Sequence, residues 1–495
     1  MVFGFSRRSD AKSEHAIGLS TLRANGIEGK PLVVYSFVTP EHRLPVADPA
    51  GDWYLNTAIV PTLRPGESAL VTKLLPGLEN YYHLMGLLRK GTELIQVEPN
   101  LSSNTRSPFG YAATDPLVLA ERRHINGKYV LVSPFSTNTI NSHARRLGIQ
   151  TIGFPDSTLT NNKALIREKE IAEKYGIRTL PGFITYDYDD VKQAERKFSG
   201  TPHGIWMKLP VGSGGDYVMH LHDASKAEIY SGRNRIRHLL AEHFRREKFE
   251  GFEGFWPQNM FSPKDFPLII ETDVRNLVEP GIGKVINGST QIITNTNGTA
   301  EVGMMSQQIT TKEGIYIGNI PLIREYQINS HVKLLLEEEA TKVGRYNIEV
   351  NGYHGIQGID WFLVYNGKNI QYFLTELNSR PTIATIAWMV SEKLEADSWV
   401  ITNAYTTKPM TSIDDFISLV GDKLASPTSI YDTKERIAGE GLVVPIAFRT
   451  LIGANGKTIP STDMKIQVFG SDIGHCHRIL NSLEEKGIIF TERRD

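Results

Sequence analysis

Short apolar runs separated by polar stretches mark the first third of the chain. The segments KPLVVYSFV (30–38), TELIQVEP (92–99) and GKYVLVSPF (127–135) are rich in β-branched and aromatic residues, which is typical of strands. Residues 136–155 indicate a helix followed by another short strand. The alternation predicts a three-layer α/β unit that ends at the polar stretch DSTLTNN (156–162).

After Asn161 the apolar residues recur at helical spacing. They reach as far as Gly176, so we expect a helix that ends there. A strand, a charged helix, a second strand and a glycine-rich loop are predicted next (182–187, 189–198, 204–210 and 211–218).

Strand patterns dominate the following part of the chain. One helix interrupts them, and we expect it to begin at Ser330 and to end at Gly344. Asn366 and Gly367 predict the turn of a hairpin. The predicted strands are 266–274, 289–295, 301–309, 355–367 and 369–381. From about Thr411 onward, helices at 413–424 and 476–487 and strands at 441–453 and 464–470 predict a small α/β unit.

Length and charge narrow the class of protein. A chain of 495 residues is long enough for two to four domains of about 100–200 residues each. The 54 lysines and arginines nearly cancel the 55 aspartates and glutamates, so no global field favours nucleic acid or a membrane surface. One cysteine, Cys476, no secretory leader and no run of about 18 apolar residues predict a soluble, cytoplasmic protein.

The hairpin strands carry the candidate metal ligands. Glu376, Asn378 and Arg380 alternate along the second strand and are expected to share one face, with Asp360 alongside on the first. Carboxylate and amide oxygens without thiol or imidazole suit Mg²⁺ that is shared with phosphate. The alternative is a polar strand end closed by an Arg380–Glu376 salt bridge.

A lysine precedes the glycine-rich loop. Lys208 ends its strand, and the amides of 212–215 could fold over phosphate while the lysine approaches as a point charge. The order of residues is not that of a Walker sequence, and a plain turn is the alternative. Glu271 at the end of the apolar strand 266–274 could likewise be only a strand terminus.

The order of these elements resembles the ATP-grasp superfamily. The final strand of that family has an acid, an apolar residue, Asn, any residue, Arg and Pro, and ELNSRP (376–381) matches at every position. The preceding acidic strand GIDWFLV (358–364) also matches in kind and distance. The resemblance covers roughly 161–410, and the N-terminal unit resembles the pre-ATP-grasp domain. Within the superfamily, the overall arrangement is most similar to the peptide-ligase branch that includes the pheganomycin peptide ligase and the butirosin acyl-carrier ligase.

The resemblance implies a role for each matching residue. Lys208 would contact the α- and β-phosphates, Arg380 would lie near the transferred phosphoryl group, and both would be catalytic, while Lys163 would lie at the phosphate or nucleotide edge. Asp360, Glu376 and Asn378 would bind one or two Mg²⁺, or Mn²⁺. The remaining nucleotide-binding residues implied are Gly212, Ser213, Gly214 and Gly215 as a lid, Glu271, Thr272 and Val274 at adenine, and Glu279 at ribose. One departure is Gly358, which stands where dipeptide-forming relatives often have arginine.

The activity implied is an ATP- and Mg²⁺-dependent carboxylate–amine ligase that forms an acyl phosphate and releases ADP and phosphate. Its partners would be a small carboxylate and an amine, free or carrier-bound, in peptide or secondary-metabolite biosynthesis, with a homodimer expected by analogy. The alternatives are a phosphotransferase of the same fold and a non-catalytic ATP-binding regulator. The domains expected are 1–156 (pre-ATP-grasp α/β), 157–410 (ATP-grasp α+β, with a lid lobe at about 178–270 and a metal-site lobe at about 271–410) and 411–495 (C-terminal α/β extension).

Overall fold

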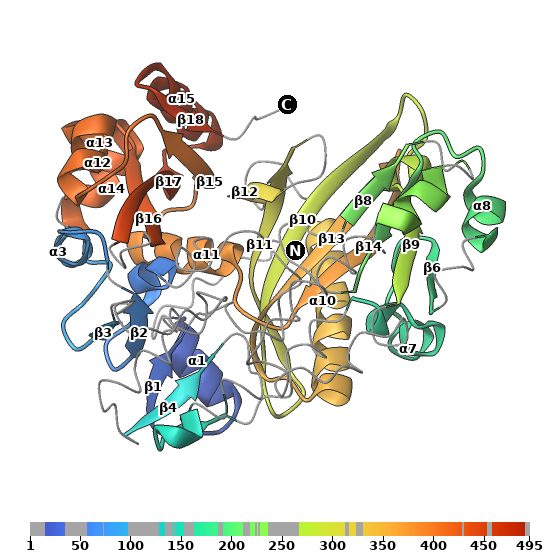
Figure 1. Cartoon of the computed structure of the whole chain (residues 1–495), viewed down its shortest axis with the longest axis horizontal. Helices are drawn as coiled ribbons and strands as arrows, with labels where there is room; N and C mark the ends of the chain where they lie inside the picture. Colours follow the sequence, from blue (N-terminus) through green and yellow to red (C-terminus); the bar gives the residue numbers. More distant parts are fainter. Residues whose placement is uncertain are drawn as a thin grey trace, which may run out of the picture.

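Three β-sheets organise the chain, which is described here from a computed structural model (Figure 1). They confirm the predicted mixture of a parallel α/β unit with antiparallel sheets. The structure describes residues 15–34, 57–72, 74–97, 128–133, 141, 144–152, 163–186, 192–210, 218–222, 225, 228–235, 267–311, 316–322, 330–427, 430–452 and 458–490.

The N-terminal sheet is parallel and has the strand order β3-β2-β1-β4-β5. Its central strands are buried on both faces, as parallel strands flanked by helices usually are. The strands are β1 (Lys30–Val33), β2 (Ser68–Thr72), β3 (Glu93–Val97), β4 (Tyr129–Val132) and β5 (Gln150–Thr151), with helices α1 (Ile17–Ala24), η2 (Val60–Thr62) and α3 (Leu78–Leu84).

A four-stranded antiparallel sheet of order β6-β9-β7-β8 forms a separate lobe. One of its faces packs on helix α8 (Lys192–Phe198) through Ala194 and Phe198. Figure 1 shows α8 on the side of this lobe that is remote from the large sheet, so the other face is turned toward the large sheet. The strands are β6 (Gly182–Thr185), β7 (Ile205–Lys208), β8 (Val218–Leu221) and β9 (Leu268–Thr272).

The large sheet has nine strands in the order β14-β13-β10-β11-β12-β15-β17-β16, with β18 paired to β15. The C-terminal segment predicted as a small α/β unit therefore supplies strands to the same sheet as the predicted metal ligands. These strands are β10 (Gly283–Thr294), β11 (Ala300–Thr310), β12 (Tyr316–Pro321), β13 (Gly355–Asn366), β14 (Asn369–Asn378), β15 (Trp399–Thr406), β16 (Leu442–Ile452), β17 (Thr458–Phe469) and β18 (Ile488–Phe490).

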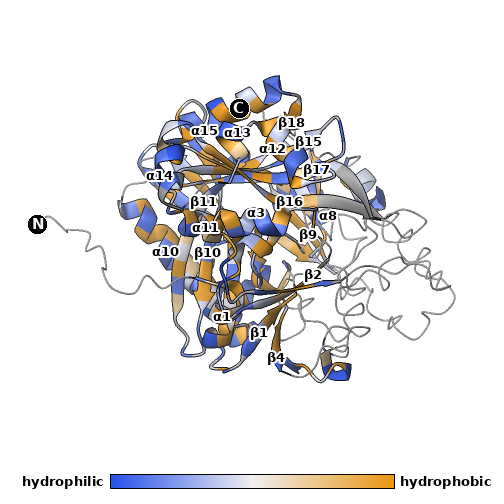
Figure 2. Cartoon of the chain, turned by 90° about the vertical axis from the view of Figure 1, so that its left-hand side faces the viewer, coloured by the Kyte–Doolittle hydropathy of each residue, from blue (hydrophilic) through white to orange (hydrophobic). Residues whose placement is uncertain are grey.

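Helices cover both faces of the large sheet. Helix α10 (Ser330–Asn351) packs against Ile359, Trp361 and Leu363 of β13, and helix α11 (Ile383–Leu394) belongs to the other core, which faces the N-terminal sheet. The remaining helices of the C-terminal segment are α12 (Ile413–Val420), α13 (Asp422–Ala425), α14 (Ile430–Gly439) and α15 (Ile473–Glu485). Figure 2 shows such surface helices with hydrophilic and hydrophobic sides over largely hydrophobic strands.

Two predicted helix boundaries were wrong. The helix expected from Asn161 is a short 3-10 turn, η3 (Leu165–Arg167), followed by α7 (Lys169–Tyr175), although Gly176 ends it in the left-handed region as predicted. Helix α10 runs through Gly344 to Asn351. A Cβ at Gly344 would lie 3.1 Å from Ala300 Cβ and from Ile292 Cδ1, so this glycine serves the close approach of helix and sheet.

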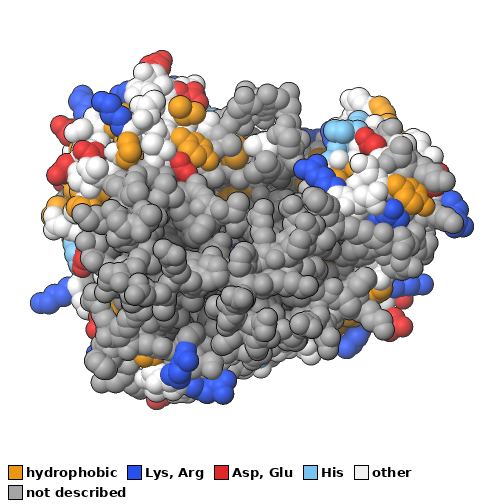
Figure 3. Space-filling model, viewed as in Figure 1, with side chains coloured by type: hydrophobic (Ala, Val, Ile, Leu, Met, Phe, Trp, Pro, Cys, Tyr) orange, Lys and Arg blue, Asp and Glu red, His pale blue; other side chains and the backbone are white. Residues whose placement is uncertain are grey.

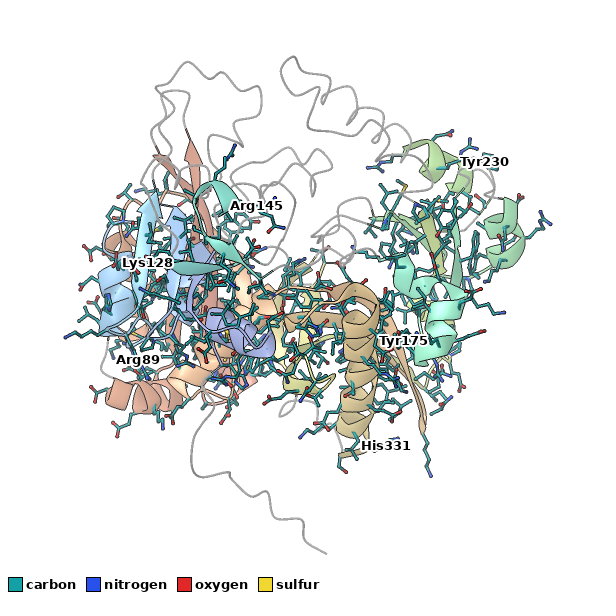
Figure 4. The ribbon with its side chains drawn as sticks, turned by 90° about the horizontal axis from the view of Figure 1, so that it is seen from below. Arg89, Lys128, Arg145, Tyr175, Tyr230 and His331 are labelled. Carbon is teal, nitrogen blue, oxygen red and sulfur yellow. The ribbon has the colours of Figure 1, made fainter. Side chains whose placement is uncertain are left out.

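Helix α7 packs on α10 in the core of the large sheet. The rings of Tyr175 and Tyr346 pack edge to face with centroids 5.5 Å apart, and Figure 4 places Tyr175 beside α10. In Figure 3 the described acidic and basic side chains are scattered around the rim of one face, with neither sign gathered in one place. Within the described ranges, no helix is long and apolar enough to cross a membrane.

Candidate functional site

Strands β13 and β14 bring the predicted metal ligands together. Asp360 is the register partner of Glu376, and Gly358 is that of Asn378. The Asn378 Nδ2 donates to Asp360 Oδ2 at 3.2 Å. Residues between Asn366 and Asn369 form the turn, with Gly367 at a φ of 62°, so the predicted hairpin is confirmed.

A β-bulge lies immediately beside the acids. Asp360 pairs with Glu376 while Trp361 pairs with Leu374, so Thr375 is an extra residue on β14. Bulges of this kind re-aim side chains and free a main-chain group from the ladder. The carbonyl of Thr375 is used elsewhere, because it accepts a hydrogen bond from Arg167 Nη2 at 2.6 Å.

Asp360 faces away from α10, since its neighbours Ile359 and Trp361 pack against that helix. Burial and the nearby charge of Glu376 raise the pKa of Asp360 to about 6, although hydrogen bonds from Ser289 and Gln308 and the charge of Arg380 oppose the rise. Two carboxylates held opposite each other with one amide form an all-oxygen set that would gain from a bound cation. This set fits Mg²⁺, which needs only one or two protein carboxylates beside phosphate oxygens and water.

One cation of the cluster comes from the segment before α7, which packs in the core of the large sheet. Lys163 is buried, and its Nζ lies 3.2 Å from Glu376 Oε1. Its main-chain N–H donates to the carbonyl of Pro210, just beyond β7, at 2.9 Å. Lys163 therefore links the lysine strand to the acids. Glu376 thus pairs with Lys163, and the alternative pairing of Glu376 with Arg380 stays a prediction.

Lys208 and Glu271 form a buried ion pair on the face of the small sheet that is turned away from α8. Glu271 Oε1 pairs with Lys208 Nζ, and Oε2 pairs with Arg167 at 3.1 Å. Burial opposes ionisation of Glu271, but the charges of Lys208 and Arg167 outweigh it and hold its pKa below the usual value. Burial also lowers the pKa of Lys208, with the charge of Glu271 opposing the shift. The contact of Glu271 with adenine stays a prediction.

Arg167 is a site residue that sequence reasoning missed. Besides Glu271 and Thr375, it donates from Nη1 to the carbonyl of Lys163 at 2.6 Å, so one guanidinium joins the small sheet, the segment before α7 and the bulge of β14. The available signal was its spacing: Arg167 follows Lys163 by four residues, which places both on one side of a predicted helix.

The other residues predicted to bind the nucleotide do not all lie near the acids. Thr272 ends β9, and its N–H donates to Pro181, while Val274 begins the 3-10 helix η4 (Val274–Leu277) and packs with Phe373. Glu279 is exposed, and its N–H donates to Asn366 Oδ1 at the far turn of the hairpin. Six residues of strand separate that turn from Asp360, roughly 20 Å. The predicted lid, Gly212, Ser213, Gly214 and Gly215, lies outside the described residues.

Arg380 lies two residues beyond the end of β14, and its N–H donates to the carbonyl of Asn378 at 2.7 Å in a tight turn. Its charge reaches Asp360, because it lowers the pKa of that acid. Gly358 is enclosed: a Cβ there would lie 2.6 Å from Thr382 Cγ2. The packing of α11 against β13 thus excludes the arginine that dipeptide-forming relatives often have at this position.

No protein-family model and no curated protein matches the chain by sequence. Among solved structures, the biotin carboxylase of Campylobacter jejuni, in a β-γ-ATP complex, aligns over 94% of this chain and 93% of its own with a TM-score of 0.50 and 10% identity. The chain has the ATP-grasp fold. At this identity the likeness concerns the fold alone.

Two further solved structures are similar at lower scores. The biotin carboxylase domain of the Hydrogenobacter thermophilus 2-oxoglutarate carboxylase is 12% identical, covers 94% of this chain and 91% of its own, and has a TM-score of 0.48. The N5-carboxyaminoimidazole synthetase of Staphylococcus aureus is 10% identical, covers 92% and 98%, and has a TM-score of 0.46. The assignment of the ATP-grasp fold rests on the first comparison and not on these two.

Proposed function

We propose that the chain is an ATP- and Mg²⁺-dependent ligase that joins a carboxylate to an amine through an acyl phosphate, with release of ADP and phosphate. The observation that carries the proposal is a cluster of charged residues that come from three segments of the chain. Lys163 and Lys208 supply its cations, and Asp360 and Glu376 supply its carboxylates. A cluster with cations and hard oxygen ligands on facing elements suits a metal-bound polyphosphate.

An apolar cluster beside the charged one supports a nucleotide as the ligand. Val274, Val364 and Phe373 are buried together, with Phe362 packed against them. Phe362 follows Asp360 by two positions on β13, so both side chains project from the same face of the sheet. An apolar region for a base next to a charged region for phosphates is the usual make-up of a cofactor pocket.

Asp360, Glu376 and Asn378 would hold the Mg²⁺ ion, which would neutralise phosphate charge and orient the terminal phosphoryl group. Lys208 would contact the α- and β-phosphates, and Lys163 would counter charge next to Glu376. Phosphoryl transfer demands positioning and charge compensation more than covalent chemistry from the protein. No nucleophilic side chain is required.

In the first step, an oxygen of the substrate carboxylate attacks the γ-phosphorus of ATP, the bond to the β,γ-bridging oxygen breaks, and ADP leaves. In the second, the amine attacks the acyl carbon, loses a proton and displaces phosphate. Arg380, whose charge reaches Asp360, would stabilise the transferred phosphoryl group. From the order of its elements, we infer that the chain is close to the branch of the pheganomycin and butirosin ligases. Its substrates would be a small acid and an amine, and its compartment would be the cytoplasm.

The test is ADP release over a panel of amino acids and short peptides, each with and without an amine acceptor. A ligase needs both substrates for full turnover, whereas a phosphotransferase releases ADP with one. Lys208→Ala and Glu376→Gln are expected to lower turnover at least about 100-fold. Turnover at the wild-type rate in either folded variant contradicts the site assignment.

A further inference from the structure

A buried polar network connects helix α10 to the turn that follows β14. Asn347 of α10 is fully buried, and its Nδ2 donates to Ser379 Oγ at 2.8 Å and to Gln357 Oε1 at 2.6 Å. The Ser379 hydroxyl donates back to Asn347 Oδ1 at 3.2 Å. Ser379 lies between Asn378 and Arg380 in the chain, so the network holds the residue that separates a proposed metal ligand from the proposed phosphoryl contact.

Further hydrogen bonds anchor the network on the helix and on the sheet. Asn351, one turn further along α10, donates to Asn347 Oδ1 at 2.7 Å. Gln357 of β13 donates from Nε2 to Thr294 Oγ1 on β10 at 3.1 Å. Both polar atoms of the Asn347 side chain thus have partners, and one orientation of the amide satisfies them all.

An asparagine is a costly residue at this place. The neighbours of Asn347 on α10, Val343 and Tyr346, belong to the apolar core between helix and sheet. Burying an amide there is unfavourable unless its hydrogen bonds are made, and an apolar residue would fill the space without that requirement. The cost is offset by hydrogen bonds to Asn351 on the helix, to Gln357 on β13 and to Ser379 in the turn.

We propose that Asn347 is a positioning residue for the metal-binding turn, acting through Ser379. The inference rests on the proposed function. Side chains alternate along the strand end, so the Ser379 side chain is directed to α10 while that of Asn378 reaches Asp360 on the opposite face. The hydrogen bond from Asn347 restrains Ser379, and this orients the side chain of Asn378 and, through the tight turn, that of Arg380. Hydrogen bonds that hold a metal-binding group from behind are typically worth about 10–100-fold in metal affinity.

The test measures ADP binding to the full chain by titration calorimetry with and without Mg²⁺. The dissociation constant without Mg²⁺ divided by the one with Mg²⁺ measures how much the metal strengthens ADP binding. We expect Asn347→Ala and Ser379→Ala to lower that ratio by about 10-fold while ADP alone binds almost as in the wild type. Val343→Ala, on the same helix, is the matched control: it opens a cavity in the same core and leaves the ratio unchanged.

Two results overturn the proposal. The ratio could stay at its wild-type value in both folded variants, whether or not ADP itself binds more weakly, or Val343→Ala could lower the ratio as much as the other two. If Asn347→Ala fails to fold, Ser379→Ala carries the test, and Ser379→Thr, which keeps the hydroxyl, is expected to restore the ratio. A wild-type chain that binds no ADP in either condition refutes the proposed function itself.

Discussion

Arg167 gives the sharpest prediction about how the two lobes are held together. Its side chain is 6% exposed, and its guanidinium binds the carboxylate of Glu271 and the carbonyls of Lys163 and Thr375. Arg167→Met keeps much of the length and apolar stem of the side chain and removes all three interactions. Glu271, which is 1% exposed, then keeps Lys208 as its counter-charge and loses one oxygen's partner.

The expected loss is large because the pair is buried. Removing one partner of a buried ion pair costs about 3–5 kcal/mol in free energy of unfolding. Arg345→Met is the matched control: Arg345 pairs with Glu349 on the surface of α10 and is 67% exposed, so its substitution is expected to cost at most about 1 kcal/mol. Arg167→Lys keeps the charge without the planar fork and should fall between the two.

The assay is urea unfolding followed by tryptophan emission, with the free energy taken by linear extrapolation. The double variant Arg167→Met with Glu271→Gln should lose less stability than the sum of its single variants, because the two residues are in contact. An Arg167→Met variant that unfolds within about 1 kcal/mol of the wild type would refute the account of Arg167 as the link between the lobes.

Three more predictions concern packing, pH and the nucleotide. Gly358→Ala brings a Cβ to 2.6 Å from Thr382 Cγ2 and should destabilise the chain by about 1–3 kcal/mol; a melting temperature equal to that of the wild type would show that α11 can move away. Burial lowers the pKa of His15, but its hydrogen bond to Glu392 and the charges of Glu392 and Glu301 raise that pKa overall. The protonated His15 therefore stabilises the fold fully below the ordinary pKa of about 6.5, and this stabilisation is lost as pH rises through the raised value. The melting temperature of His15→Gln should therefore trail the wild type more at about pH 5.5 than at about pH 9, and an equal gap at both contradicts the assignment. Trp206 shares a face of the small sheet with Lys208 and Glu271, so MgATP should change its emission, and a Trp206→Phe chain that keeps the full signal would place the nucleotide elsewhere.

The hairpin of β13 and β14 could be predicted from the sequence, but its β-bulge could not. Asn366 and Gly367 with period-two patterning are enough to predict that Asp360 meets Glu376 and Asn378. The bulge at Thr375 leaves no trace in that pattern, because the Thr375 carbonyl is held by Arg167, which lies 208 positions earlier in the chain. The pairing of β7 with β9, which joins Lys208 to Glu271 across a gap of about sixty residues in the chain, is likewise decided by tertiary contacts.

The role of Gly344 and the partners of the C-terminal strands could not be predicted from the sequence for the same reason. Gly344 resembles a helix stop in the sequence, yet the structure uses its missing side chain to let α10 approach Ala300 and Ile292. The strands after Thr411 were predicted as a small separate unit. Periodicity identified them, but it carries no information on partners, and β17 joins β15 of the large sheet.

The most direct measurement for the central claim is an anomalous difference map from crystals grown with Mn²⁺ and a non-hydrolysable ATP analogue. The account predicts a manganese peak within coordination distance of Asp360 and Glu376, with the analogue's phosphates between that peak and Lys208. A peak elsewhere, or an analogue whose phosphates lie away from Lys163 and Lys208, would contradict it.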